Sequence, residues 1–167
     1  FVGIKANYTY TNSNIATSKL TKYANPDPNA TDKILIKTVI QNRPLNGQAQ
    51  HVANLSFLYK NQQQGWDGQL ALSYTGDRLY AISRYLNDDI YQSGYFQMDA
   101  SLEKKLDKGF ILFLKASNIL DTPMIQYLKK SNPSNEIIPE YEKYKGGTLI
   151  RKDYYGQNFQ IGCRYKF

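Results

Sequence analysis

The sequence predicts an all-β chain of antiparallel, up-and-down strands. Six segments carry apolar and polar side chains at alternating positions, the spacers between them alternate long and short, and the last segment ends on an aromatic residue, Phe167. Side chains two positions apart share one face of a strand, so each segment would have one apolar and one polar face. We therefore expect the chain to form part of a transmembrane β-barrel, in which the apolar face meets lipid.

The first three strands are predicted at 1–11, 50–60 and 66–75. Each alternates apolar or aromatic side chains with mostly polar ones, which is the pattern of a strand with two different faces. The apolar positions are Val2, Ile4, Ala6, Tyr8 and Tyr10 in the first, Ala53, Leu55, Phe57 and Tyr59 in the second, and Trp66, Gly68, Leu70, Leu72 and Tyr74 in the third.

The last three strands are predicted at 95–106, 110–119 and 153–167. The apolar positions are Phe96, Met98, Ala100 and Leu102 in the fourth, Phe110, Leu112, Leu114 and Ala116 in the fifth, and Phe159, Ile161, Cys163, Tyr165 and Phe167 in the sixth. Each of the six segments is at least about as long as the 9 to 11 residues that cross a bilayer at the usual strand tilt.

The lengths of the spacers predict how the chain is oriented in the membrane. Spacers 12–49, 76–94 and 120–152 are long, whereas 61–65 and 107–109 are short. Outer-membrane barrels have short periplasmic turns and long extracellular loops. We therefore expect a Gram-negative outer-membrane protein with both chain ends in the periplasm and the three long spacers outside the cell.

The chain end carries a second signal. Polar Gln160, then Gly162, aromatic Tyr165 and terminal Phe167 resemble the C-terminal targeting signal of Gram-negative outer-membrane proteins. The resemblance implies that the barrel-assembly machinery recognises this strand. It agrees with the loop rhythm, which independently places the chain end in the periplasm.

Aromatic residues make up 14% of the chain, and 15 of them are tyrosines. Tyrosine suits a membrane interface because its ring enters lipid while its hydroxyl stays among the headgroups. We expect aromatic girdles that include Trp66, Tyr74, Tyr59 and Tyr165. The alternative explanation of this composition is a soluble β-protein that binds glycans through its tyrosines.

Charge and rare residues exclude several functions. The formal net charge is +7, but the lysines and arginines are scattered, whereas nucleic-acid binding needs clustered charge. The charge would instead suit outer-membrane lipid and anionic lipopolysaccharide, or an anionic ligand. The longest apolar run has five residues, 110–114, too short for a transmembrane helix. With one histidine, His51, and one cysteine, Cys163, no catalytic or metal-binding set can be assembled, so we expect no enzyme and no cofactor.

Charged and polar residues fall into two predicted groups. For Asp99, Glu103 and Lys105, which belong to the first group, a structural role in ion pairs is favoured over ligand binding, because barrel interiors are generally polar. For the second group, solvated loop charge is favoured over contact with a cation or ligand. The first group, predicted to face the lumen, is Lys5, Asn7, Asp99, Glu103, Lys105, Lys115 and Arg164; the second, on loops, is Asp88, Asp89, Glu140 and Glu142.

Six strands cannot close a membrane barrel, since the smallest bacterial barrels have eight. The chain also begins at Phe1 without a methionine or a signal peptide. We therefore expect residues 1–167 to be the C-terminal segment of a larger barrel, whose other strands would complete the hydrogen bonds of the two sheet edges.

Several stretches of the sequence carry recognisable motifs: Arg43-Pro44-Leu45-Asn46-Gly47-Gln48, Gly65-Trp66-Asp67, 70–78, 98–105, 115–123 and 155–167. These motifs resemble the last barrel strands of TonB-dependent outer-membrane receptors, in the style of Bacteroides-like bacteria. The resemblance implies a barrel of about 22 strands around an N-terminal plug that this chain lacks. It further implies import of a siderophore, haem, vitamin, glycan or peptide, coupling to the TonB complex through the missing N-terminal region, and a surface lipoprotein lid as a partner. The alternative is a receptor-like barrel that serves as a scaffold in an outer-membrane complex.

Overall fold

The computed structural model describes residues 1–129 and 142–166 of the chain. Over these residues the fold is all-β, with antiparallel sheets of six, five and two strands. No helix within the described ranges is long and apolar enough to cross a membrane. Of the sheets in this described part, none closes on itself, so the six-stranded sheet has open edges at β1 and β13.

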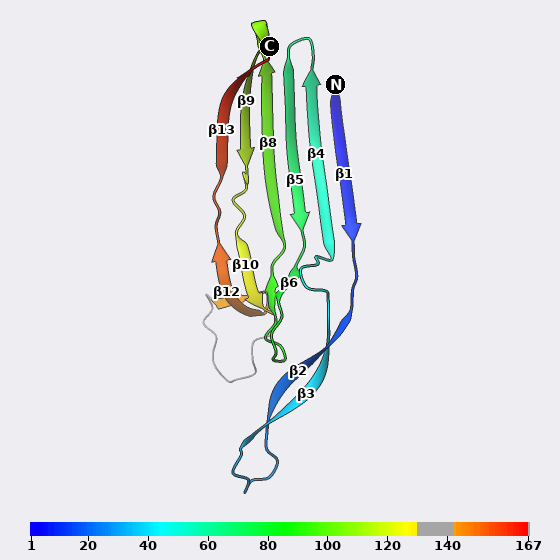
Figure 1. The fold of residues 1–167 in the computed structure, drawn as a ribbon, viewed down its shortest axis with the longest axis vertical. Helices are drawn as coiled ribbons and strands as arrows, with labels where there is room; N and C mark the ends of the chain where they lie inside the picture. Colours follow the sequence, from blue (N-terminus) through cyan, green and yellow to red (C-terminus); the bar gives the residue numbers. More distant parts are fainter. Residues whose placement is uncertain (130–141, 167) are drawn as a thin grey trace.

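The six-stranded sheet confirms the strands that the alternation predicts. Each strand pairs in antiparallel fashion with the next of the six along the chain, and the strands stand side by side in this order in Figure 1. They are β1 (Val2–Tyr10), β4 (His51–Asn61), β5 (Trp66–Thr75), β8 (Tyr95–Lys105), β9 (Phe110–Ser117) and β13 (Asn158–Tyr165).

The register gathers the apolar positions on one face. Residues paired directly across antiparallel strands project from the same side of a sheet. One such row runs Ile4, Phe57, Leu70, Ala100, Ala116 and Phe159, and a row on the opposite side runs Gly3, Leu58, Gln69, Ser101, Lys115 and Gln160. We call the first side, which carries every predicted apolar position from Val2 to Tyr165, the apolar face, and the other the polar face.

Nothing in the described part of the chain covers the apolar face. Ile4 is 66% exposed, Phe159 65% and Ile161 85%. The buried residues, among them Leu79 and Tyr127, all lie outside the six long strands. The six-stranded sheet is therefore a single layer without a core, whereas a soluble sheet buries its apolar face against a second layer.

The two short spacers form tight turns at one end of the sheet, which we call the turn end. The β8–β9 turn is the 3₁₀ turn Asp107–Gly109, in which Gly109 has a φ of 82°. Only glycine adopts this conformation freely, and a Cβ there would lie 2.5 Å from the Lys166 carbonyl oxygen. The N-terminus and the end of β13 also lie at the turn end (Figure 1).

The described residues of the long spacers, predicted as loops, form seven further strands at the opposite, loop end. The β2–β3 hairpin extends furthest from the sheet, and the other five form the sheet β11-β12-β10-β7-β6 (Figure 1). The seven are β2 (Ile15–Ala24), β3 (Ile34–Arg43), β6 (Arg78–Ala81), β7 (Ile90–Gln92), β10 (Met124–Leu128), β11 (Lys143–Tyr144) and β12 (Gly147–Asp153).

The sixth predicted strand, 153–167, is too long at its start. Asp153 is the last residue of β12, residues 154–157 are not in a strand, and β13 begins at Asn158. Gly156 has a φ of 74°, a conformation that interrupts an extended chain and that the alternation alone does not reveal. Phe167 lies outside the described residues.

Gly162 of β13 leaves space for an aromatic ring, because it has no side chain. It pairs with Phe113 of β9 on the polar face, and a Cβ at this position would overlap the Cζ and Cε1 atoms of the Phe113 ring. A ring packed over a glycine helps to fix strand register. Gly162 therefore has a packing role in the structure; its part in a targeting signal stays a prediction.

We expect Gly162→Ala to destabilise the β9–β13 pair by about 1–3 kcal/mol, because the added methyl group overpacks the site. Phe113→Leu in the same chain should recover part of this loss by removing the ring. Urea unfolding of the two single variants and the double variant in detergent measures the coupling. Additive effects, with no recovery in the double variant, would contradict the packing role.

Candidate functional site

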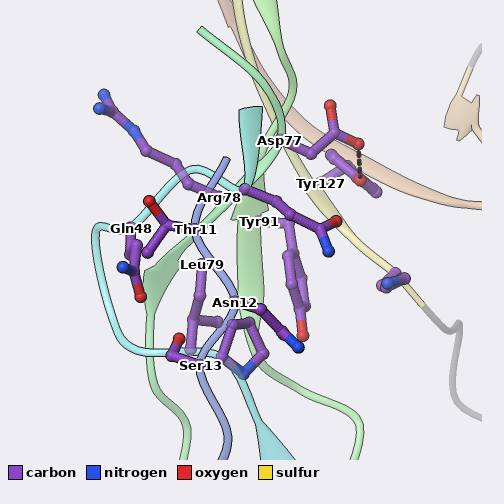
Figure 2. Close-up of a pocket in the computed structure, with 12 residues that line it drawn as sticks. Thr11, Asn12, Ser13, Gln48, Asp77, Arg78, Leu79, Tyr91 and Tyr127 are labelled. Carbon is purple, nitrogen blue, oxygen red and sulfur yellow. Dashed lines mark hydrogen bonds between the residues drawn. The ribbon is translucent and has the colours of Figure 1, made fainter. Parts of the chain in front are cut away.

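A cavity of about 280 Å³ lies at the loop end of the chain (Figure 2). Its walls are formed by the segments on either side of the β2–β3 hairpin, the β5–β6 connection with β6, β7, and β10 with the residue that follows it, so residues far apart in sequence meet there. The lining is mostly polar: Thr11, Asn12, Ser13, Gln48, Gln50, Asp77, Arg78, Tyr91, Tyr127 and Lys129, with Pro44 and Leu79.

Asp77 is the centre of the hydrogen bonds on one side of this cavity. Its Oδ1 accepts from the backbone N of Gly94 at 2.6 Å and from Nζ of Lys145 at 2.8 Å. Its Oδ2 accepts from the Tyr127 hydroxyl at 3.0 Å, the bond drawn in Figure 2. One carboxylate thus joins the β5–β6 connection to the start of β8, to β10 and to the β11–β12 turn.

These contacts shift two pKa values in opposite directions. Partial burial raises the pKa of Asp77, but hydrogen bonds from Lys145, Gly94 and Tyr127 outweigh it and hold the pKa below its ordinary value of 3.8. Burial raises the pKa of Tyr127, and its hydrogen bond to the Asp77 carboxylate raises that pKa further. The pair is thus a carboxylate acceptor with a phenol donor near neutral pH.

The lowered pKa of Asp77 predicts acid sensitivity at the loop end. The folded state holds fewer protons on the Asp77 carboxyl than the unfolded state. The contribution of this group to the free energy of unfolding is therefore complete above pH 3.8, and it falls as the pH drops through the pKa of the folded state. The expected loss is at most about 1 kcal/mol, because the ion pair with Lys145 is solvent-exposed. Denaturant unfolding at neutral and acidic pH should show that the free energy of unfolding depends less on pH in Asp77→Asn than in the unchanged protein. An equal pH dependence in the two proteins would contradict the stabilising role of the Asp77 carboxylate.

A buried ion pair anchors the β2–β3 hairpin. Nζ of Lys19 in β2 lies 2.5 Å from Oδ1 of Asp89, with side-chain exposures of 0% and 2%. Lys19 also donates to the Ser83 carbonyl oxygen, and the Ser83 backbone N donates to the same Asp89 oxygen at 2.8 Å. The pair connects the hairpin to the β6–β7 connection through two charges removed from water.

Asp89 corrects the prediction of solvated loop charge. It is buried and paired, because a lysine 70 residues away supplies the countercharge that lets a carboxylate leave water. Its neighbour Asp88 and the more distant Glu142 are half-buried, and Glu140 lies outside the described residues. No group of three or more potential metal-ligating His, Cys, Asp or Glu residues occurs within the described part of the chain.

The residues predicted to face a lumen all lie on the polar face of the six-stranded sheet. Glu103 pairs with Arg164 at 2.5 Å, Asp99 accepts from the backbone N of Asn118, and Asn7 bonds to a neighbouring asparagine of β4. Lys5, Lys105 and Lys115 share this face by register. The Asn7 and Asp99 contacts brace neighbouring strands, whereas the Glu103–Arg164 pair reaches across β9 from β8 to β13. That this face lines a lumen stays a prediction.

The four predicted girdle residues lie on the apolar face. Tyr59, Trp66 and Tyr165 are near the turn end and Tyr74 is near the loop end. The structure shows an aromatic neighbour at each end. The ring centroids of Phe96 and Tyr74 are 4.7 Å apart, and those of Phe110 and Tyr165 are 4.9 Å apart. At the loop end, the Tyr8 hydroxyl and Nδ1 of His51 are also hydrogen-bonded at 2.7 Å.

Sequence reasoning missed the cavity, the Asp77 cluster and the partner of Asp89. A local signal existed for Asp77, which lies two residues after the end of β5, within the quoted 70–78 motif. Lys19 gave no such signal, since it is one of several lysines in a polar spacer. Comparison of the chain with family models, curated proteins and solved structures finds no match in any of the three.

Proposed function

We propose that the chain is the C-terminal barrel segment of a TonB-dependent outer-membrane transporter. Its apolar face would contact lipid and its polar face the barrel interior. The observation that carries the proposal is the register, which collects the apolar positions of six strands on one uncovered face. A continuous exposed apolar surface of this kind marks a site of membrane or partner contact.

The dimensions and the aromatic residues support a lipid-facing surface. Strand β5 has 10 residues, which span about 34 Å at about 3.4 Å per residue. A tilt of about 35–45° reduces this length to about 25 Å, the height of the apolar band in outer-membrane barrels. Tyr74 and Phe96 lie toward one end of the face and Trp66 and Tyr165 toward the other, which resembles two interfacial girdles.

The open edges of the sheet determine the partners in this proposal. Unpaired backbone groups are costly in hydrocarbon, so strands from the rest of the barrel would pair with β1 and β13. The turn end would be periplasmic, toward the plug, the TonB complex and the barrel-assembly machinery. The loop end would be extracellular, where the cavity beside Asp77 meets incoming ligand and a surface lipoprotein lid.

Cell fractionation of the full-length protein tests the membrane part of the proposal. We expect recovery in the outer-membrane fraction and a heat-dependent shift in electrophoretic mobility, which is typical of folded barrels. Recovery as a folded, monodisperse protein without detergent would instead support the soluble glycan-binding alternative.

Energy coupling tests the transport part. If the protein imports its ligand, deletion of TonB should abolish uptake while leaving the amount of folded protein in the membrane unchanged. Uptake or assembly that is indifferent to TonB would point to the scaffold role.

A further inference from the structure

The β2–β3 hairpin has one covered edge and one open edge among the described residues. The outer edge of β2 is covered, because Leu20 donates its backbone N–H to the Arg84 carbonyl oxygen at 3.0 Å and accepts from the Leu86 backbone N at 2.9 Å. Strand β3 pairs with β2 on one side, and no strand of the described chain pairs with its other side. We call this unpaired side of β3 the open edge.

The bonds of Leu20 show which residues of β3 face the open edge. Leu20 lies opposite Thr38 in the register of the two strands. In an antiparallel pair, opposite residues alternate between exchanging both backbone hydrogen bonds and exchanging none. Because the N–H and C=O groups of Leu20 point away from β3, those of Thr38 point away from β2. The same holds at every second residue, so the backbone groups at the open edge belong to Ile34, Ile36, Thr38, Ile40 and Asn42.

The side chains of these residues make the open edge suitable for a further strand. They project from one face of the hairpin, on which Ile34 and Ile36 are each 61% exposed and Ile40 is 67% exposed. Strand β3 has 10 residues in regular register, with neither a proline nor a bulge. Proteins usually shorten, bend or cover an edge strand of this kind, because its backbone can pair with another chain. We therefore expect a binding partner to cover the open edge.

Charge indicates what kind of strand fits there. Strands β2 and β3 carry basic side chains, including Lys19 and Lys37, but no carboxylate. Lys19 is neutralised by Asp89, whereas Lys37 is exposed, lies over the Tyr23 ring and has no carboxylate partner within the described part of the chain. Lys37 projects from the face opposite the isoleucines, so it would lie beside a residue of any strand added to β3. A carboxylate at that position would supply the missing countercharge.

We propose that the open edge of β3 binds an extended segment of a partner protein as a third strand of the hairpin sheet. The segment carries apolar side chains at alternate positions, beside the isoleucines, and a glutamate or aspartate beside Lys37. Main-chain hydrogen bonds to the open edge supply affinity, and the two faces select the sequence. The hairpin extends furthest from the six-stranded sheet, which leaves room for a second protein beside it (Figure 1). Because β3 is not part of the apolar face, this inference is independent of the membrane proposal.

Calorimetric titration of the full-length protein with three short peptides tests the chemistry of the partner. In the acidic peptide, valine alternates with threonine and glutamate; in the basic peptide, lysine replaces glutamate; the shuffled peptide has the composition of the acidic one without the alternation. We expect the acidic peptide to bind about ten-fold more tightly than either of the others. Equal binding of the acidic and basic peptides, equal binding of the acidic and shuffled peptides, or no binding of the acidic peptide would overturn the proposal.

Hydrogen exchange locates the acidic peptide on the open edge. Its binding should slow exchange of the backbone amides of Ile36, Thr38 and Ile40, whereas the amides of Lys37 and Val39, which point toward β2, should change little. Slow exchange of the three edge amides in the full-length protein before any peptide is added would show that the protein covers this edge itself. That result would also overturn the proposal.

Two substitutions at one position separate the backbone of the edge from its side chains. Thr38→Pro removes an N–H at the open edge without removing a hydrogen bond to β2, and it should weaken binding of the acidic peptide at least about ten-fold. Thr38→Val keeps the N–H and is the matched control, which should bind the peptide as the unchanged protein does. Exchange of the β2 amides reports whether the hairpin is folded in each variant. Unchanged affinity in a folded Thr38→Pro protein would contradict the proposal.

A charge reversal tests the role of Lys37 without changing the backbone. In Lys37→Glu, the basic peptide should bind more tightly than the acidic one, and an unreversed preference would contradict the placement of the carboxylate. Sedimentation of the full-length protein alone tests the remaining occupant, a second copy of this chain. A dimer that Thr38→Pro dissociates would assign the open edge to the second copy and overturn the proposal of a separate partner.

Discussion

Leu70→Arg should sharply reduce the amount of folded protein in the membrane. Leu70 lies in the middle of β5 on the apolar face, in a row with Phe57 and Ala100. If this face contacts lipid, a charged side chain at mid-depth costs about 2–4 kcal/mol. Urea unfolding in lipid vesicles measures the loss of stability, and heat-shifted electrophoresis of membrane fractions measures the loss of folded protein.

Gln69→Arg is the matched control for this experiment. Gln69 is the preceding residue of β5, it is similarly exposed, and it lies on the polar face in a row with Leu58 and Ser101. An arginine there would face the aqueous interior, so we expect a change within about 0.5 kcal/mol. Equal damage from the two arginines, or greater damage from Gln69→Arg, would contradict the assignment of faces.

Lys19→Met should release the β2–β3 hairpin from the β6–β7 connection. The substitution keeps much of the side-chain volume but leaves the Asp89 carboxylate buried without its countercharge. Removal of one partner from a buried ion pair costs about 3–5 kcal/mol. We expect faster hydrogen exchange and faster proteolysis throughout β2 and β3, while the six-stranded sheet keeps its protection.

A second substitution separates the loss of the pair from a general loss of packing. Asp89→Asn in the Lys19→Met chain removes the unpaired charge yet can still accept from the Ser83 backbone N, so the double variant should be more stable than Lys19→Met alone. Lys22→Met, at an exposed position of the same strand, should leave hairpin exchange unchanged. Equally fast hydrogen exchange of the hairpin in Lys22→Met would contradict the anchoring role of the Lys19–Asp89 pair.

The six long strands could be predicted because their signal is local. Alternation of period two in β1, for example, fixes which side chains share a face, and a short turn such as 107–109 fixes the antiparallel neighbour. The register then follows from matching apolar positions, since a slip of one residue would exchange the two faces.

The strands within the long spacers could not be predicted in the same way, because pairing between segments distant in sequence forms them. Strand β7 has three residues, too few to show a period, and it pairs with β10, where Tyr91 lies opposite Tyr127. The candidate site depends on the same kind of contact: Lys19 and Asp89 are 70 residues apart. A single sequence names such residues but not their partners.

A nitroxide scan along β5 tests the central claim, that the apolar face contacts lipid, most directly. In a Cys163→Ser background, single cysteines at 67–73 would carry the label in vesicles. Labels at 68, 70 and 72 should collide more with lipid-soluble oxygen, and labels at 67, 69, 71 and 73 more with a water-soluble nickel complex, in strict alternation. Access to the nickel complex at every position, without a period of two, would contradict the account.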